Sequence, residues 1–172
     1  IADSKPGTSR MAWGADLTGK ENFSSPHRLP MKKSIDHISV RGKRVLVRLD
    51  LNVPLDDAGR ITDDRRIRAA LPTVKKLLGD GGRVILMSHL GRPDEEPERK
   101  HNYTLKPVSQ RLTELLGMPV PLLPDCVGSE IVARIGRMSD GDVLLLENLR
   151  FHEAETIKDK KAASNPKLRK QK

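Results

Sequence analysis

Short runs of apolar, β-branched residues alternate along the chain with segments whose apolar residues recur every three or four positions. The apolar runs are 44–50, 83–88, 120–123 and 142–147. The helical segments between them are 63–78, 104–116 and 129–137. Strands that alternate with helices are joined by right-handed crossovers, which place helices on both faces of a parallel sheet. The pattern therefore predicts an α/β fold, a mainly parallel sheet with flanking helices.

Turn-forming and capping residues bound the predicted helices. Asp63 and Asp64 place carboxylates at the start of the first helix, where the helix dipole favours negative charge. Thr104 is the expected N-cap of the second helix, and Gly117 ends it. Pro72 lies inside the first helical pattern and lacks a backbone N–H, so it predicts a kink or an early interruption there.

The patterned residues occupy only the middle of the chain. Residues 1–38 show no sustained periodicity and are expected to be an extension without its own core, 39–152 are the folded domain, and 153–172 are a basic tail. The apolar run 143–146 is far below the roughly 20 residues of a membrane span, and we expect none. Cys126, the single cysteine, supports neither an intrachain disulfide nor a cysteine-based metal site.

The basic charge of the chain is concentrated at its end. The net charge is +9, and residues 153–172 hold seven Lys or Arg against three Asp or Glu. Such a tail is typical of a contact with nucleic acid, an anionic lipid surface or an acidic protein, and the alternative is a solvated terminus. The first residue is Ile1, as after removal of a targeting peptide. We therefore expect an organelle, mitochondrion or plastid, with the cytoplasm as the alternative.

Polar side chains follow three of the predicted strands, at the sheet edge where open α/β sheets bind ligands. Asp50 and Asn52 follow the first strand and, by the alternation of extended residues, should project to the same side. The basic members of this group are Arg66, His89, Arg92 and Arg150. Guanidinium groups form paired hydrogen bonds with phosphate and carboxylate oxygens, so a small polyanion is a suitable ligand. From charge placement alone, surface ion pairs and helix capping are an equal alternative.

Several motifs, in order, resemble those of phosphoglycerate kinases. They are RVLVRLDLNVP at 44–54, ITDDRRI at 61–67, SHLGRP at 88–93, LPDCVG at 123–128 and LLENLRF at 145–151. The resemblance covers about residues 33–153. Leu51 stands where the family usually has phenylalanine, and beyond Glu153 the motifs end. The implied fold is the Rossmann-like N-terminal domain of phosphoglycerate kinase in an incomplete form.

The resemblance also implies a substrate and a set of binding residues. The family transfers phosphate between ATP and 3-phosphoglycerate with magnesium. The residues that correspond to its 3-phosphoglycerate ligands are Asp50, Asn52, Arg66, His89, Arg92 and Arg150. Arg66 would also face charge that develops during transfer, and is catalytic only if a nucleotide-binding half completes the site. No segment here resembles that half, so we expect no cofactor and no metal in this chain, with Mg-ATP serving the complete enzyme.

Three functions of different kinds are compatible with these features. The first is a non-catalytic accessory or structural subunit, inactive alone, whose protein partners cover the incomplete sheet and the basic tail. The second is part of an active phosphoglycerate kinase of glycolysis or carbon fixation whose nucleotide-binding half is missing from this chain. A module that senses 3-phosphoglycerate without turnover is a third. The sequence slightly favours the first.

Overall fold

The computed structural model describes residues 33–95 and 97–157. Residues 1–32 and 158–172, which hold most of the predicted extension and basic tail, lie outside this description. The elements in chain order are η1 (Ile35–His37), β1 (Arg44–Arg48), α1 (Arg65–Gly79), β2 (Arg83–Met87), η2 (Pro97–Tyr103), α2 (Lys106–Leu116), α3 (Ser129–Gly136), β3 (Val143–Leu145), η3 (Leu149–Phe151) and α4 (Glu153–Thr156). Strands alternate with helices as the sequence predicts.

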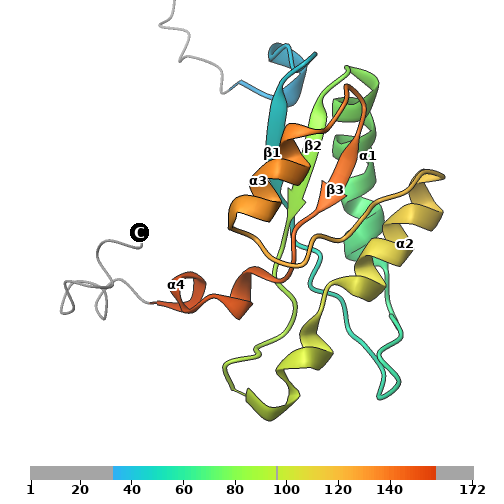
Figure 1. The fold of residues 1–172 in the computed structure, drawn as a ribbon. Coiled ribbons are helices and arrows are strands. Elements are labelled where there is room, and N and C mark those ends of the chain that lie inside the picture. The colour runs from blue at the N-terminus through green and yellow to red at the C-terminus, as the bar shows by residue number, and fades with distance from the viewer. Residues whose placement is uncertain (1–32, 96, 158–172) are drawn as a thin grey trace, which may run out of the picture. The chain divides into compact units, whose positions relative to one another are not determined.

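The three strands form one parallel sheet in the order β1-β2-β3 (Figure 1). The α/β prediction is confirmed. Each strand pairs with the next along the chain. Helix α1 lies in the connection between β1 and β2, and α2 and α3 lie in the connection between β2 and β3. Because the strands are parallel, their carboxyl ends meet at one edge. Within residues 33–95 and 97–157 no helix is long and apolar enough to cross a membrane.

One face of the sheet is packed against α1 and α2. Val84 and Leu86 of β2 and Leu145 of β3 are completely buried there. They meet Ile67 and Val74 of α1, which recur at helical spacing. The core also includes Leu51, Val53 and Leu90, which lie in the segments that follow β1 and β2. This face therefore anchors the loops at the carboxyl edge as well as the strands.

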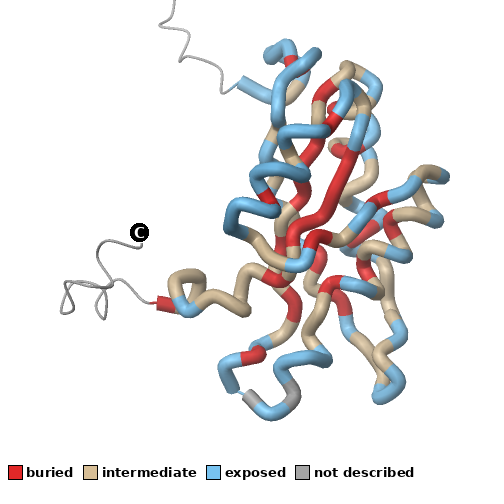
Figure 2. Tube along the Cα trace, in the orientation of Figure 1, coloured by how far each residue is buried: buried red, intermediate tan, exposed pale blue. Residues whose placement is uncertain are grey.

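The other face is covered by α3 over β2 and β3 but not over β1. Leu46, Ile85 and Leu144 lie side by side in the strand register. Ile85 and Leu144 are 5% and 4% exposed beneath Ile131 of α3, whereas Leu46 is 58% exposed. Figure 2 shows how burial concentrates in the middle of the fold. The expected uncovered apolar surface is present at Leu46, and Val132 on the outer side of α3 is also exposed.

The predicted strand at 120–123 is wrong. This segment forms only one isolated parallel bridge, between Leu122 and Leu145. Leu123 N–H donates to the Leu145 carbonyl, and Leu145 N–H donates to the carbonyl of Pro121. Pro121 has no N–H to donate to β3, so the ladder does not extend toward the start of the segment. The segment is a short extended contact beside β3.

Two predictions about helix ends and continuity are also corrected. The interruption expected at Pro72 does not occur, because α1 continues through it to Gly79. An internal proline costs about 3 kcal/mol, but Ile67 and Val74, on either side of it, are both fully buried in the core and hold the two halves of the helix together. The N-cap of α2 is Leu105 and not Thr104. The Thr104 hydroxyl donates to Glu147 Oε2 at 2.7 Å, and its oxygen accepts from the Lys106 N–H at 3.3 Å.

Candidate site at the carboxyl edge of the sheet

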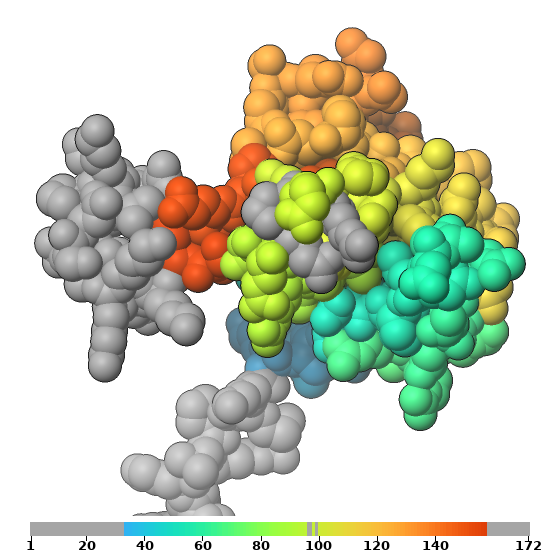
Figure 3. All heavy atoms as spheres, turned by 90° about the horizontal axis from the view of Figure 1, so that it is seen from below, coloured from blue at the N-terminus to red at the C-terminus, as the bar shows by residue number. Residues whose placement is uncertain are grey.

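The segments that follow the three strands meet at Gly91. Its N–H donates to Asn52 Oδ1, which follows β1, at 2.9 Å. Its carbonyl accepts from Arg150 Nη1, which follows β3, at 2.6 Å. Figure 3 views this edge from below, where the 89–103 segment lies between the 50–66 segment and the residues that follow β3. One backbone residue thus joins three predicted site segments.

Gly91 can hold this position because it has no side chain. Its φ is +58°, in the left-handed region that favours glycine, and a Cβ built on it would lie 2.2 Å from Cε1 of Tyr103. The Tyr103 ring therefore packs directly on the Gly91 backbone. The SHLGRP motif needs its glycine for this close approach.

Two buried polar side chains support the loops. Ser88 Oγ accepts from Leu51 N–H at 3.0 Å. Asn148 Oδ1 accepts from the backbone N–H groups of Leu90 and Arg150, each at 3.1 Å, and its Nδ2 donates to the Leu90 carbonyl at 2.8 Å. Both side chains are fully buried. Sequence reasoning did not single them out, although both directly follow apolar strand runs, as Asp50 does.

Asp50 is paired with Arg66 across the site. Arg66 Nη1 lies 2.5 Å from Asp50 Oδ2, and Asn52 N–H donates to Asp50 Oδ1 at 3.3 Å. Burial raises the pKa of the Asp50 carboxyl, but the hydrogen bonds from Arg66 and from the Asn52 backbone outweigh it and lower the pKa. Asp50 is therefore held in its charged form, and its partner Arg66 is held over the same edge.

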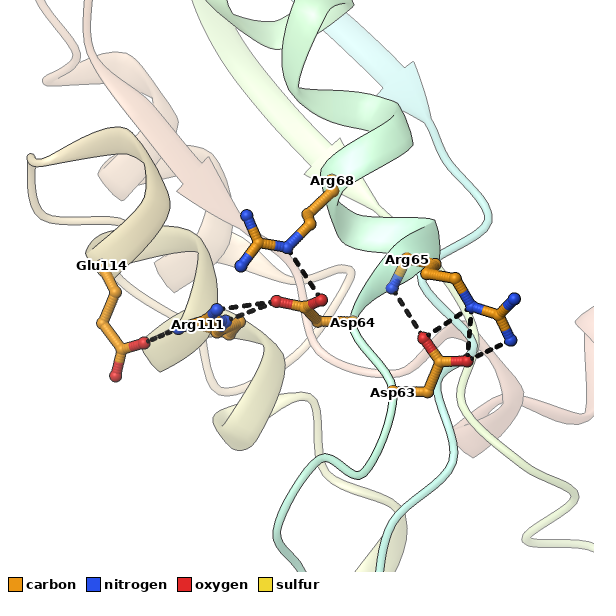
Figure 4. Close-up of polar contacts among 6 residues, drawn as sticks. All are labelled: Asp63, Asp64, Arg65, Arg68, Arg111 and Glu114. Atoms are coloured by element: carbon orange, nitrogen blue, oxygen red, sulfur yellow. Dashed lines mark hydrogen bonds and ion pairs between the residues drawn. The ribbon is translucent and has the colours of Figure 1, made fainter.

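The first turn of α1, which carries Arg66, is fixed by two carboxylates (Figure 4). Asp64 accepts from Arg68 Nε at 2.9 Å and from Arg111 Nε of α2 at 2.8 Å, and so ties α1 to α2. Asp63 accepts from the N–H and the guanidinium of Arg65, and this guanidinium lowers the Asp63 pKa to about 2. The carboxylates expected at this helix start are present, and they anchor it through arginines.

His89 and Arg92 complete the predicted basic group in different ways. Burial lowers the pKa of His89, and the positive charge of Arg150 lowers it further. Arg92 points into the loop and pairs with Glu95, with 2.8 Å between Nη1 and Oε1, and its side chain is 69% exposed. The structure thus brings Asp50, Asn52, Arg66, His89 and Arg150 together around Gly91. Arg92 lies next to them but is engaged with Glu95.

An open cleft of about 1280 Å³ borders this group. The 52–59 segment and the start of α1 form one wall, and the 101–107 segment forms the other. Asn52, Arg66 and Gly91 line it together with His101 and Lys106, two basic residues that the sequence reasoning missed. The cleft has room for a small phosphorylated acid. Because Arg66 and Arg150 are already bonded to oxygens of the chain, an anion has to compete with those partners.

Comparisons with known proteins agree with the motifs. The sequence model of the phosphoglycerate kinase family matches residues 35–171. The match continues past Glu153, where the recognised motifs end, so the expectation that the resemblance stops there is corrected. The phosphoglycerate kinase of Chloroherpeton thalassium is 54% identical over 134 residues, which are 78% of this chain and 33% of the relative. That of Aquifex aeolicus is 54% identical over 132 residues, 77% and 32% respectively.

Solved structures give the same result for the fold. Phosphoglycerate kinase from Pyrococcus horikoshii matches with a TM-score of 0.67 and 33% identity, over 73% of this chain and 30% of that one. Phosphoglycerate kinase from Coxiella burnetii matches with a TM-score of 0.60 and 35% identity, over 81% and 32%. The chain spans about a third of the length of these relatives. It belongs to the phosphoglycerate kinase family.

Proposed function

We propose that this chain supplies the 3-phosphoglycerate-binding part of a phosphoglycerate kinase. The observation that carries the proposal is the convergence at Gly91 of the three strand-end segments that hold the family motifs. Asn52 and Arg150 are each bonded to this residue, and Asp50 is bonded to Arg66 beside it. Polar side chains that follow three parallel strands then surround one small anion, at the edge where such sheets bind ligands.

The chemistry of the group is that of phosphate and carboxylate binding. Arg66 and Arg150 offer planar, permanently charged donors, and His89 adds a third donor whose charge depends on pH. Asp50 suits a hydroxyl of the ligand, because a carboxylate accepts hydrogen bonds and repels phosphate. Phosphoryl transfer works mainly by positioning and charge neutralisation. The residues described here position an acceptor, and we propose that the donor nucleotide with its magnesium is bound elsewhere in a complete enzyme.

Binding of 3-phosphoglycerate to the 172-residue chain tests the proposal. Titration calorimetry at low salt should give weak binding that is lost at high salt, since exposed charges are screened over a Debye length of about 8 Å at physiological ionic strength. Arg66→Ala and Arg150→Ala should each weaken it. Arg137→Ala is the matched control, because Arg137 is exposed at the end of α3. Binding that is equally affected by all three variants would reject the assigned site.

A coupled assay separates binding from turnover. The isolated chain should show no ATP-dependent phosphorylation of 3-phosphoglycerate, because acceptor-side residues alone cannot align a donor. Turnover that disappears in Arg66→Ala would contradict this and show that the chain carries a complete active site.

A second candidate is the accessory or structural subunit, and one observation favours it. Leu46 of β1 and Val132 of α3 are 58% and 65% exposed, and exposed apolar side chains on the face of an edge strand are a liability that proteins normally cover. In this proposal a protein partner covers them. The test is the native mass of the chain purified from its source. A stoichiometric complex with another protein supports the subunit, and a bare chain argues against it.

A further inference from the structure

Three side chains with metal-binding atoms meet away from Gly91, where the 123–128 loop contacts the residues that follow η3. His152 Nε2 lies 2.5 Å from Asp125 Oδ1. Cys126 Sγ, on the neighbouring residue, donates to the Glu147 carbonyl at 2.8 Å. The ligand atoms of Asp125, Cys126 and His152 all lie within 4.8 Å of one another. The separation of 26 residues between Cys126 and His152 matches no metal motif, which is why no metal site was expected from the sequence.

The three atoms are close to the geometry of a tetrahedral metal site. Zinc binds sulfur at about 2.3 Å and histidine nitrogen or carboxylate oxygen at about 2.0–2.2 Å, which places ligand atoms about 3.3–3.6 Å apart. The Asp125 and His152 atoms, 2.5 Å apart, are closer than this, and Cys126 Sγ lies within 4.8 Å of both, so the site forms by rotation of side chains. These rotations are open to Asp125 and His152, whose side chains are 48% and 38% exposed.

The electric field around Cys126 favours a cation over an anion. The carboxylates of Asp125, Glu147 and Glu155 place negative charge near Cys126. The same charges attract a divalent ion. A thiolate and a carboxylate together neutralise a dication, and an imidazole that binds a metal through its nitrogen lone pair is a third ligand that adds no charge.

We propose that Asp125, Cys126 and His152 form a binding site for zinc or a metal of similar softness. Thiolate and imidazole ligands favour such ions over magnesium or calcium. When the metal binds, the Cys126 thiol proton is released to solvent and a metal–sulfur bond forms, with no change of oxidation state. The fourth position is left for water or the Glu147 carbonyl. The metal would join the 123–128 loop to the segment that carries Arg150, two residues before His152.

Titration of the full chain with Cd²⁺ tests the site, because a thiolate–cadmium bond absorbs in the ultraviolet and Cys126 is the single cysteine. The absorption should saturate at one equivalent, be displaced by Zn²⁺ and not by Mg²⁺, and vanish in Cys126→Ser. His152→Gln should raise the Kd at least tenfold, since loss of even an outer-shell partner costs about 10–100-fold. His37→Gln is the control, because His37 is exposed in η1, and its Kd should be unchanged.

Asp125→Asn provides a second variant, and circular dichroism of each variant confirms that it is folded. A higher Kd for cadmium in folded His152→Gln or Asp125→Asn supports the three-residue site. Absence of the absorption at one equivalent overturns the proposal. So does an absorption that both variants leave unchanged, because cadmium would then be held by Cys126 and solvent or by two chains. The assay uses no phosphorylated ligand, so its result is independent of the proposed phosphoglycerate site.

Discussion

Helices cover the two faces of the sheet to different degrees. Under α1 and α2, the row Val47, Leu86 and Leu145 is buried or half-buried across all three strands. Under α3, the row of Leu46, Ile85 and Leu144 begins with a leucine that is 58% exposed. The strands are the same and the register is the same. What differs is that α3 covers two strands, whereas the opposite helices and their loops cover three.

This difference explains which side of the candidate site is held by packing. Leu51, between Asp50 and Asn52, and Leu90, between His89 and Gly91, both point into the complete core and are at most 2% exposed. Each buried leucine thereby holds the site residues on either side of it. The contacts toward the incomplete face are instead ion pairs at the surface, such as that of Arg48 with Glu155. Packing positions the site from one side only.

The largest expected effect compares leucines on the two faces. Leu145→Ala should lower the free energy of unfolding by about 2–5 kcal/mol, because it leaves a cavity in a fully buried position. Leu46→Ala should change it by less than about 1 kcal/mol, as for other surface substitutions. Urea unfolding measures both. Equal losses would mean that Leu46 is covered in solution, for example by residues outside those described, and would remove the contrast between the faces.

Substitution of Gly91 tests whether the complete face holds the site. Gly91→Ala should cost about 1–3 kcal/mol of backbone strain and, in addition, push Tyr103 away and weaken anion binding. Gly117→Ala is the matched control. Its φ of +69° imposes similar strain, but nothing lies within 4 Å of the added Cβ. If both variants unfold at the same urea concentration, the Tyr103 contact contributes nothing and the loop is positioned in another way.

Much of the fold was predictable because its signals are local. The runs at β1, β2 and β3 and the helical spacing of Ile67 and Val74 each lie within one element, and all were found. The prediction failed at 120–123, where apolar residues are present but Pro121 removes a ladder donor. The interruption expected at Pro72 was also wrong, because burial of the residues around it outweighs the proline penalty. At 120–123 a missing N–H outweighed the local strand preference. At Pro72 tertiary packing outweighed the local preference against a helix.

The candidate site was predictable to a lesser degree. Its polar residues follow strands, and parallel topology then brings them to one edge, which is how Asp50 and Arg150 were chosen together. The ion-pair and hydrogen-bond partners of these side chains could not be predicted from the sequence. Pairing of Arg92 with Glu95, and of Asp125 with His152 across 27 residues, depends on loop conformations that no periodicity encodes. Lys106 was missed because it belongs to a helix start and not to a strand end.

A smaller effect is expected from the protonation of His89. The pKa of His89 is below its usual 6.5 because of burial and of Arg150, so His89 is neutral at pH 7. A bound phosphate favours the charged imidazole and raises this pKa. Binding therefore takes up a proton, and the contribution of His89 grows as pH falls through the pKa of the imidazole in the complex.

The measurement is the affinity for 3-phosphoglycerate at pH 7.5 and 5.5 in the natural chain and in His89→Gln. The ligand phosphate titrates near pH 6, but this applies equally to both proteins and cancels in their ratio. The affinity of the natural chain divided by that of His89→Gln should rise about two- to fivefold at the lower pH, as for an ion pair worth up to about 1 kcal/mol. An unchanged ratio would place His89 outside the binding contacts.

The smallest expected effect concerns the ion pair between Arg48 of β1 and Glu155 of α4, which lies beside Leu46 on the incomplete face. The Arg48 side chain is 55% exposed, so water and salt screen the pair. A double-mutant cycle with Arg48→Ala and Glu155→Ala should give a coupling of about 0.2–1 kcal/mol that declines at high salt. Burial changes this expectation, because breaking a buried pair costs about 3–5 kcal/mol. A coupling in that range, insensitive to salt, would mean that a part of the chain or a second copy covers β1 in solution. The two faces would then be equally complete, and the exposure of Leu46 would not describe the protein in solution.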